Sequence, residues 1–144
     1  VYARGTKPGG QAWSVAVQHP EQDGYAAMLS LSDAFAVTSG GYQRYFTGPD
    51  GTVYQHILDP KTGWPVQGDL LSVTIVADSG TMADAYSTAL YVMGREAAQD
   101  FWRQNGGFDM VLITKDGQVL YTPGLADKLT ETEGSGYAYA CIEP

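Results

Sequence analysis

The run Leu70-Leu71-Ser72-Val73-Thr74-Ile75-Val76-Ala77, together with the segment that follows it, decides the fold class. The run is apolar and rich in β-branched residues, which is typical of a strand buried in the centre of a sheet. Over residues 82–93 the apolar residues recur at three- and four-residue spacing, and Gly94 follows as a C-terminal stop. This spacing predicts a helix directly after the central strand.

The segments on either side of this pair extend the pattern. Upstream, apolar and polar residues alternate with period two, so Trp13, Val15 and Val17 share one face of a predicted strand. Downstream, residues 95–104 predict a second helix. Further strands are expected at 27–31, 35–38 and 137–142, hairpins at 42–46 with 52–58 and at 108–114 with 118–122, and a short helix at 125–129. The predicted fold is α+β, with a mixed or antiparallel sheet and a central helix pair.

Composition limits the classes of protein to which the chain can belong. Its 144 residues, 44% of them hydrophobic, predict a single domain over residues 1–144. A net charge of −8 opposes binding to nucleic acid or to an anionic membrane surface. The single cysteine, Cys141, excludes an internal disulfide, and we expect it to be buried in the last strand. The chain opens on Val1-Tyr2-Ala3-Arg4-Gly5, typical of a strand that enters a turn, without Met or a signal segment, so we expect a fragment or a processed product.

A first candidate site lies in the segment Thr38-Ser39-Gly40-Gly41-Tyr42-Gln43-Arg44-Tyr45. The two glycines let the backbone approach a ligand, and the tyrosine rings can stack on a flat heterocycle. The alternative is a turn between strands whose tyrosines, including Tyr42, pack on the sheet.

A second candidate site surrounds His56, which precedes the rigid loop Asp59-Pro60-Lys61-Thr62-Gly63-Trp64-Pro65. His56 lies on the opposite strand face from Ile57, so it can project toward a cleft, where a neutral imidazole would accept a hydroxyl proton. The alternative is a histidine that only bonds backbone. For Asp59 we expect a structural role, because an Asp before Pro commonly caps a turn.

A third candidate site lies on the predicted helix, where Asp84, Ser87 and Thr88 share one face. One carboxylate and two hydroxyls are hard oxygen ligands of the kind that Mg²⁺ prefers. The alternative is a capping arrangement, Thr81-x-x-Asp84, in which Asp84 bonds the first amides of the helix. The residues alone leave both interpretations open.

Taken in order, these segments resemble a known family. The motifs are Val37-Thr38-Ser39-Gly40-Gly41-Tyr42-Gln43-Arg44-Tyr45-Phe46, His56-Ile57-Leu58-Asp59-Pro60-Lys61-Thr62-Gly63-Trp64-Pro65, Ser72-Val73-Thr74-Ile75-Val76-Ala77 and Ala83-Asp84-Ala85-Tyr86-Ser87-Thr88-Ala89-Leu90. They are similar to those of the ApbE-type FAD:protein FMN transferases. The segment Arg4-Gly5-Thr6-Lys7-Pro8 before Trp13, and Val92-Met93-Gly94 at the end of the predicted helix, also fit.

The resemblance implies a Mg²⁺-dependent bacterial enzyme that transfers the FMN moiety of FAD to a Thr or Ser hydroxyl of a target flavoprotein and releases AMP. Asp84 and Thr88 would hold the metal, and Ser87 stands where some members carry a third, acidic ligand. His56 would face the flavin and the pyrophosphate and assist the incoming hydroxyl, while Tyr42 would lie at a turn that faces the flavin. Asp84 and His56 are therefore the expected catalytic residues.

The resemblance also implies that the chain corresponds to the C-terminal part of the family domain, a T-fold-like half domain. The N-terminal part, with its D-L-x-x-x-A-K-G type segment and a further metal ligand, has no counterpart here, so we expect uncovered strand edges and a companion segment as a partner. An FAD pyrophosphatase that yields FMN and AMP, a non-catalytic association module and a homo-oligomer are the alternatives. Bacterial members are often lipid-anchored at the outer face of the cytoplasmic membrane, which implies the same location here.

Overall fold

The computed structural model describes all 144 residues and contains two helices and three sheets. In chain order the elements are β1 (Tyr2–Ala3), β2 (Trp13–Gln18), β3 (Tyr25–Leu31), β4 (Ala34–Gly40), β5 (Tyr45–Thr47), β6 (Val53–Gln55), β7 (Leu70–Ala77), α1 (Gly80–Met93), α2 (Arg95–Asn105), β8 (Asp109–Thr114), β9 (Gln118–Tyr121), the 3₁₀ turn η1 (Pro123–Leu125), β10 (Leu129–Glu131) and β11 (Ala138–Cys141). Neither helix is long and apolar enough to cross a membrane.

The main sheet has six strands in the order β1-β4-β7-β8-β9-β11. Its neighbouring strands are antiparallel except β11, which pairs parallel to β9. The predicted central strand is confirmed, because β7 has the predicted bounds and lies between β4 and β8. A second sheet has the order β10-β3-β2, and β5 with β6 forms a separate hairpin.

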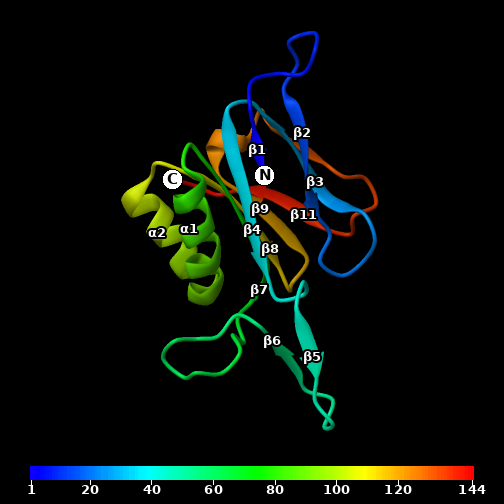
Figure 1. Cartoon of the computed structure of the whole chain (residues 1–144), viewed down its shortest axis with the longest axis vertical. Helices are drawn as coiled ribbons and strands as arrows, with labels where there is room; N and C mark the ends of the chain where they lie inside the picture. The colour runs from blue at the N-terminus through cyan, green and yellow to red at the C-terminus, as the bar shows by residue number, and fades with distance from the viewer.

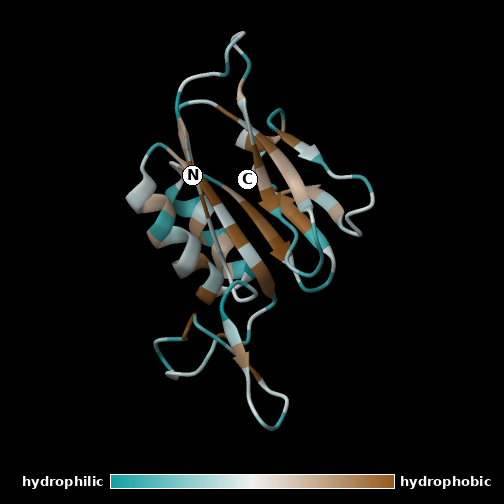
Figure 2. Cartoon of the chain, turned by 45° about the vertical axis from the view of Figure 1, so that its right-hand side comes forward, coloured by the Kyte–Doolittle hydropathy of each residue, from teal (hydrophilic) through white to brown (hydrophobic).

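The main sheet is covered on both faces (Figure 1), and this explains why β7 is apolar almost throughout. Both helices lie on one face, where Val73 and Ile75 of β7 belong to a core cluster with Leu90 of α1. On the opposite face Val76 of β7 packs in a second cluster with Leu29 of β3. Figure 2 shows the hydrophobic strands concentrated between these layers. The predicted α+β class with a helix pair is therefore confirmed.

Ser79 is the N-cap of helix α1, because its hydroxyl accepts a hydrogen bond of 3.4 Å from the amide of Met82. It ends before Gly94, whose φ of 83° lies in the left-handed region that favours glycine. Helix α2 then starts at Arg95 with no side-chain cap from its own sequence neighbours. The predicted second helix, at residues 95–104, is thus confirmed to within one residue.

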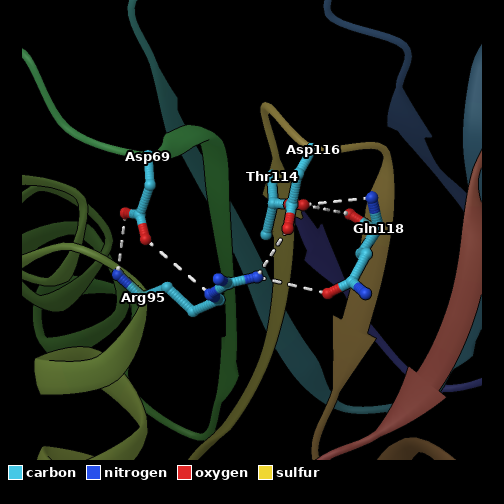
Figure 3. A network of polar contacts seen from close by, with 5 residues as sticks. All are labelled: Asp69, Arg95, Thr114, Asp116 and Gln118. Atoms are coloured by element: carbon cyan, nitrogen blue, oxygen red, sulfur yellow. Dashed lines mark hydrogen bonds and ion pairs between the residues drawn. The ribbon is translucent and has the colours of Figure 1, made fainter.

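A residue from before β7 supplies the missing cap of α2, as Figure 3 shows. Asp69 accepts a hydrogen bond of 3.0 Å from the amide of Arg95 and lies 3.7 Å from its guanidinium. The same guanidinium bonds Asp116, in the β8–β9 turn, at 3.1 Å and Gln118, at the start of β9, at 3.2 Å. Arg95 therefore ties the start of α2 to two loops at the end of the main sheet.

Two predictions near the C-terminus are wrong. Residues 125–129 were expected to form a helix, but Leu129 begins strand β10 and pairs with Leu29 of β3, after a 3₁₀ turn that starts at Pro123. Cys141 was expected to be buried, but it is exposed, because β11 is the last strand of the main sheet. Strand β10 forms because it pairs with β3, which is distant in sequence. Cys141 is exposed because no further strand pairs with β11.

Strand β4 has an uncovered edge, as expected. β1 pairs only with Ala34 and Phe35, and Val1 then exchanges two backbone hydrogen bonds of 2.9 Å with Ala36. No strand continues this pairing along the rest of β4. Because alternate residues of a strand direct their N–H and C=O groups to the same side, those of Thr38 and Gly40 face the open edge, like those of Ala36.

Candidate functional site

Three hydroxyls meet where α1 packs on β4. The Oγ of Ser39 on β4 lies 2.9 Å from Ser87 Oγ and 2.9 Å from Thr88 Oγ1, both on α1. Ser87 Oγ in turn donates a hydrogen bond of 2.9 Å to the backbone carbonyl of Asp84, one turn earlier on the helix. Ser87 is fully buried, whereas Asp84 and Thr88 are exposed. The structure thus places the three predicted helix residues around one strand residue, Ser39.

The capping alternative for Asp84 is wrong. Ser79 caps α1, and Asp84 lies in the second turn, beyond the amides that need a cap. The Asp84 carboxylate makes no hydrogen bond or ion pair within the chain. A free carboxylate beside a threonine hydroxyl is a chemically suitable pair of oxygen ligands for Mg²⁺. The chain contains no group of three or more His, Cys, Asp or Glu side chains placed to hold a metal, so the set is partial.

Tyr42 lines a cavity of about 440 Å³ at the end of β4. Tyr91, Gln55 and Val66 also line this cavity. The hydroxyl of Tyr91 on α1 donates a hydrogen bond of 2.9 Å to Gln55 Oε1, and Gln55 Nε2 donates one of 2.6 Å to the carbonyl of Val66. Gly41 leaves room for this pair, because a Cβ atom at this position would displace the Gln55 amide and the Tyr91 hydroxyl.

The hydroxyl of Tyr42 is buried and has no hydrogen-bond partner. A tyrosine hydroxyl is protonated at neutral pH and can donate to a ligand, and burial raises the pKa of this one further above its ordinary value of 10.0. Neither Gln55 nor Tyr91 was singled out from the sequence. Tyr91 is 36 residues from its partner Gln55, so no local pattern marks the pair.

His56 directly follows β6, at the base of the β5–β6 hairpin. Its side chain is exposed while that of Ile57 is buried, which confirms the predicted alternation. His56 Nδ1 lies 3.1 Å from the carbonyl oxygen of Arg44. Because a carbonyl can only accept, Nδ1 carries the proton, and in a neutral imidazole Nε2 then has a free lone pair. His56 lines a pocket of about 290 Å³ with Arg44, Tyr45, Phe46, Tyr54 and Gln55.

The predicted site residues therefore form separate groups on this chain. The Tyr42 cavity and the His56 pocket adjoin each other, because Tyr45 and Gln55 line both. Asp84 lines neither pocket, and no hydrogen bond or ion pair joins it to His56.

Asp59 has the expected structural role. Its Oδ1 accepts a hydrogen bond of 2.8 Å from the amide of Lys61, and this bond stabilises the turn. The loop that follows faces the junction of α1 and α2 across a cavity of about 850 Å³, which no pattern in the sequence predicted.

Comparisons with known proteins identify the family of the chain. A family model described as the ApbE family matches residues 1–112. The FAD:protein FMN transferase of Treponema pallidum is 39% identical over 119 residues, which cover 81% of this chain and 33% of the relative. That of Rhodobacter capsulatus is 37% identical over 127 residues, covering 88% of this chain and 24% of the relative. The chain thus spans about a third or less of these two relatives.

Solved structures show the same fold. The crystal structure of the apbe protein from Thermotoga maritima superimposes with a TM-score of 0.68 at 34% identity, and the match covers 90% of this chain and 38% of that one. The apo form of the Pseudomonas stutzeri flavinyl transferase ApbE gives a TM-score of 0.63 at 32% identity, covering 92% and 38%.

Proposed function

The chain belongs to the ApbE family, and on that premise we propose that it contributes to the transfer of the FMN moiety of FAD to a Thr or Ser hydroxyl of a target flavoprotein. The curated relatives named above are FAD:protein FMN transferases, which supports flavin transfer. Because the chain spans about a third or less of their length, we propose that it acts as the C-terminal portion of such a domain, together with an N-terminal portion.

The observation that carries this proposal is the free carboxylate of Asp84, one helical turn from the exposed hydroxyl of Thr88. We propose that these two residues hold Mg²⁺, which would neutralise charge on the pyrophosphate of FAD. Ser87, the third residue of the expected set, is fully buried and hydrogen-bonded on two sides. Its position favours a supporting role over direct contact with an ion.

His56 and Tyr42 fit the remaining steps of the proposed reaction. The acceptor hydroxyl oxygen forms a bond to the FMN-side phosphorus of FAD, and the bond from that phosphorus to AMP breaks, so that AMP leaves. The proton of the acceptor hydroxyl passes to His56 Nε2, whose lone pair is free because Nδ1–H faces Arg44. Tyr42, with its unpartnered hydroxyl, donates a hydrogen bond to the flavin.

The test joins the chain to the N-terminal portion of a curated relative and follows both FMN on the acceptor protein and AMP release. Asp84→Asn and Thr88→Val should each lower transfer by roughly 100-fold, because each removes a proposed ligand of the ion. Asp127→Asn is the matched control, since Asp127 is an exposed carboxylate outside every pocket described above, and it should transfer normally. Undiminished transfer by Asp84→Asn would contradict the proposal. Free FMN without labelled acceptor would instead indicate an FAD pyrophosphatase.

A second candidate function is a non-catalytic association module. It is favoured by the single carboxylate at the proposed metal site, which is a weak ligand set on its own. Calorimetry of the unmodified chain with FAD and Mg²⁺ separates the two: absence of binding supports the module, and tight binding by the chain alone removes its main support.

A further inference from the structure

The three hydroxyls between α1 and β4 form a chain of hydrogen bonds whose direction can be deduced. Each hydroxyl has one proton to donate. The proton of Ser87 goes to the carbonyl of Asp84, because a carbonyl oxygen can only accept. Ser87 must therefore accept at its contact with Ser39, and the proton in that contact belongs to Ser39. Since the proton of Ser39 is then in use, the bond between Ser39 and Thr88 must carry the proton of Thr88.

The direction of the chain determines how the Thr88 oxygen is presented. Its proton points toward Ser39, so its lone pairs point elsewhere, and its side chain is exposed. A cation ligand must offer a lone pair and keep its proton away from the ion. Without an acceptor at Ser39, the Thr88 hydroxyl would rotate freely and would present its proton for part of the time.

We propose that Ser39 is a positioning residue that orients the Thr88 hydroxyl for binding a hard cation beside Asp84. The part concerning the cation rests on the proposed function, whereas the direction of the hydrogen bonds does not. In this role Ser87 supplies the acceptor that fixes the proton of Ser39, which gives the buried hydroxyl a purpose other than ligation.

Strand β4 is a suitable support for such a residue. Ser39 pairs with Val73 of β7, in the centre of the main sheet, so its backbone is fixed relative to α1. The neighbouring residue Thr38 faces away from α1 and bonds Thr74 Oγ1 at 2.8 Å. Thr38 therefore offers a matched control, a hydroxyl of the same strand in a similar bond, but on the opposite face.

The experiment has two readouts on the chain. A neutron crystal structure of the deuterated protein should place the deuterium of Thr88 toward Ser39, that of Ser39 toward Ser87, and that of Ser87 toward the Asp84 carbonyl. Calorimetry with Mg²⁺ alone should show affinity lowered by about 10- to 100-fold in Ser39→Ala, the range found when a partner behind a metal ligand is removed. Ser39→Thr, which keeps the hydroxyl, should restore binding, and Thr38→Val should bind normally.

The outcomes separate this inference from the proposed function. A deuterium of Thr88 that points away from Ser39 overturns the inference, and so does equal loss of affinity in Ser39→Ala and Thr38→Val, which would indicate general damage to β4. If neither the unmodified chain nor the chain joined to an N-terminal portion of a relative binds Mg²⁺, the metal site of the proposed function is contradicted, and the deuterium positions alone decide the direction of the hydroxyl chain.

Discussion

Two tyrosine hydroxyls, those of Tyr42 and Tyr137, are buried without a hydrogen-bond partner. A buried hydroxyl without a partner costs free energy, so each needs an explanation. Tyr42 lines a cavity, and a ligand there would relieve the cost. Tyr137 lines none of the pockets described above; its ring stacks on that of the buried His19, with centroids 4.7 Å apart. Its hydroxyl lies near the carboxylate of Glu21.

The buried hydroxyl of Tyr137 makes the stability of the chain sensitive to alkaline pH. Burial, with the nearby carboxylate of Glu21, raises the pKa of Tyr137 to about 12, from an ordinary value of 10.0. The folded state keeps this proton where the unfolded state has lost it, so the contribution is complete below pH 10.0 and is lost as pH rises toward about 12.

Tyr137→Phe should remove that part of the pH dependence and leave the free energy of unfolding at neutral pH unchanged or slightly higher, because the hydroxyl has no partner to lose. Urea unfolding at neutral and alkaline pH measures both effects. Tyr25→Phe, at a tyrosine that is 49% exposed, should keep the alkaline loss of the unmodified chain. The same alkaline loss in Tyr137→Phe would contradict the assignment.

At the scale of elements, α2 depends on a carboxylate outside its own sequence. Asp69 accepts from the amide of Arg95 and offsets the unfavourable positive charge at a helix N-terminus. Asp69→Ala should therefore cost about 1 kcal/mol, as loss of an N-cap does. Hydrogen exchange of the first-turn amides of α2 should speed up at the same time.

The control for this prediction is Asp100→Ala. Asp100 pairs with Arg103 within α2 at 3.0 Å, on the surface, and such pairs contribute little. An effect of Asp69→Ala no larger than that of Asp100→Ala would show that the distant cap is unimportant.

The elements that the sequence predicted are those decided by local pattern. The buried run of β7, the three- and four-residue spacing of α1 and the turn chemistry between β8 and β9 all act over a few residues. Strand β10 was missed because its partner, β3, is distant in sequence. The same holds within the site: Asp84 and Thr88 share a helical face by spacing alone, but Ser39 is 49 residues from Thr88 and joins them only in the folded sheet.

At the scale of the whole molecule, residues 42–66 form a lobe that extends from the end of the main sheet (Figure 1). Only Ile57 and Val66 of the lobe are buried in the core. Its aromatic side chains mostly pack on one another, with Phe46 stacked on Tyr54 at 5.0 Å. A lobe with so few core contacts should open locally at little free-energy cost.

Limited trypsin digestion should therefore cut first within the lobe, after Arg44 or Lys61, and leave the two faces of the main sheet intact. Mass spectrometry of the early fragments measures this. Lys61→Gln should slow the first cut, whereas Arg103→Gln, in helix α2, should not. Initial cleavage at Arg103 or Lys128 would show that the lobe is not the least stable part of the chain.

The open edge of β4 and the net charge of −8 together affect how copies of the chain behave in solution. The edge offers backbone groups that could pair with another copy, while like charges keep copies apart. Backbone pairing is insensitive to salt, but charge repulsion is screened beyond about 8 Å at physiological ionic strength. We therefore expect the colloidal stability of the chain to depend on ionic strength, with dilute salt keeping the edge open and concentrated salt favouring its closure by self-association.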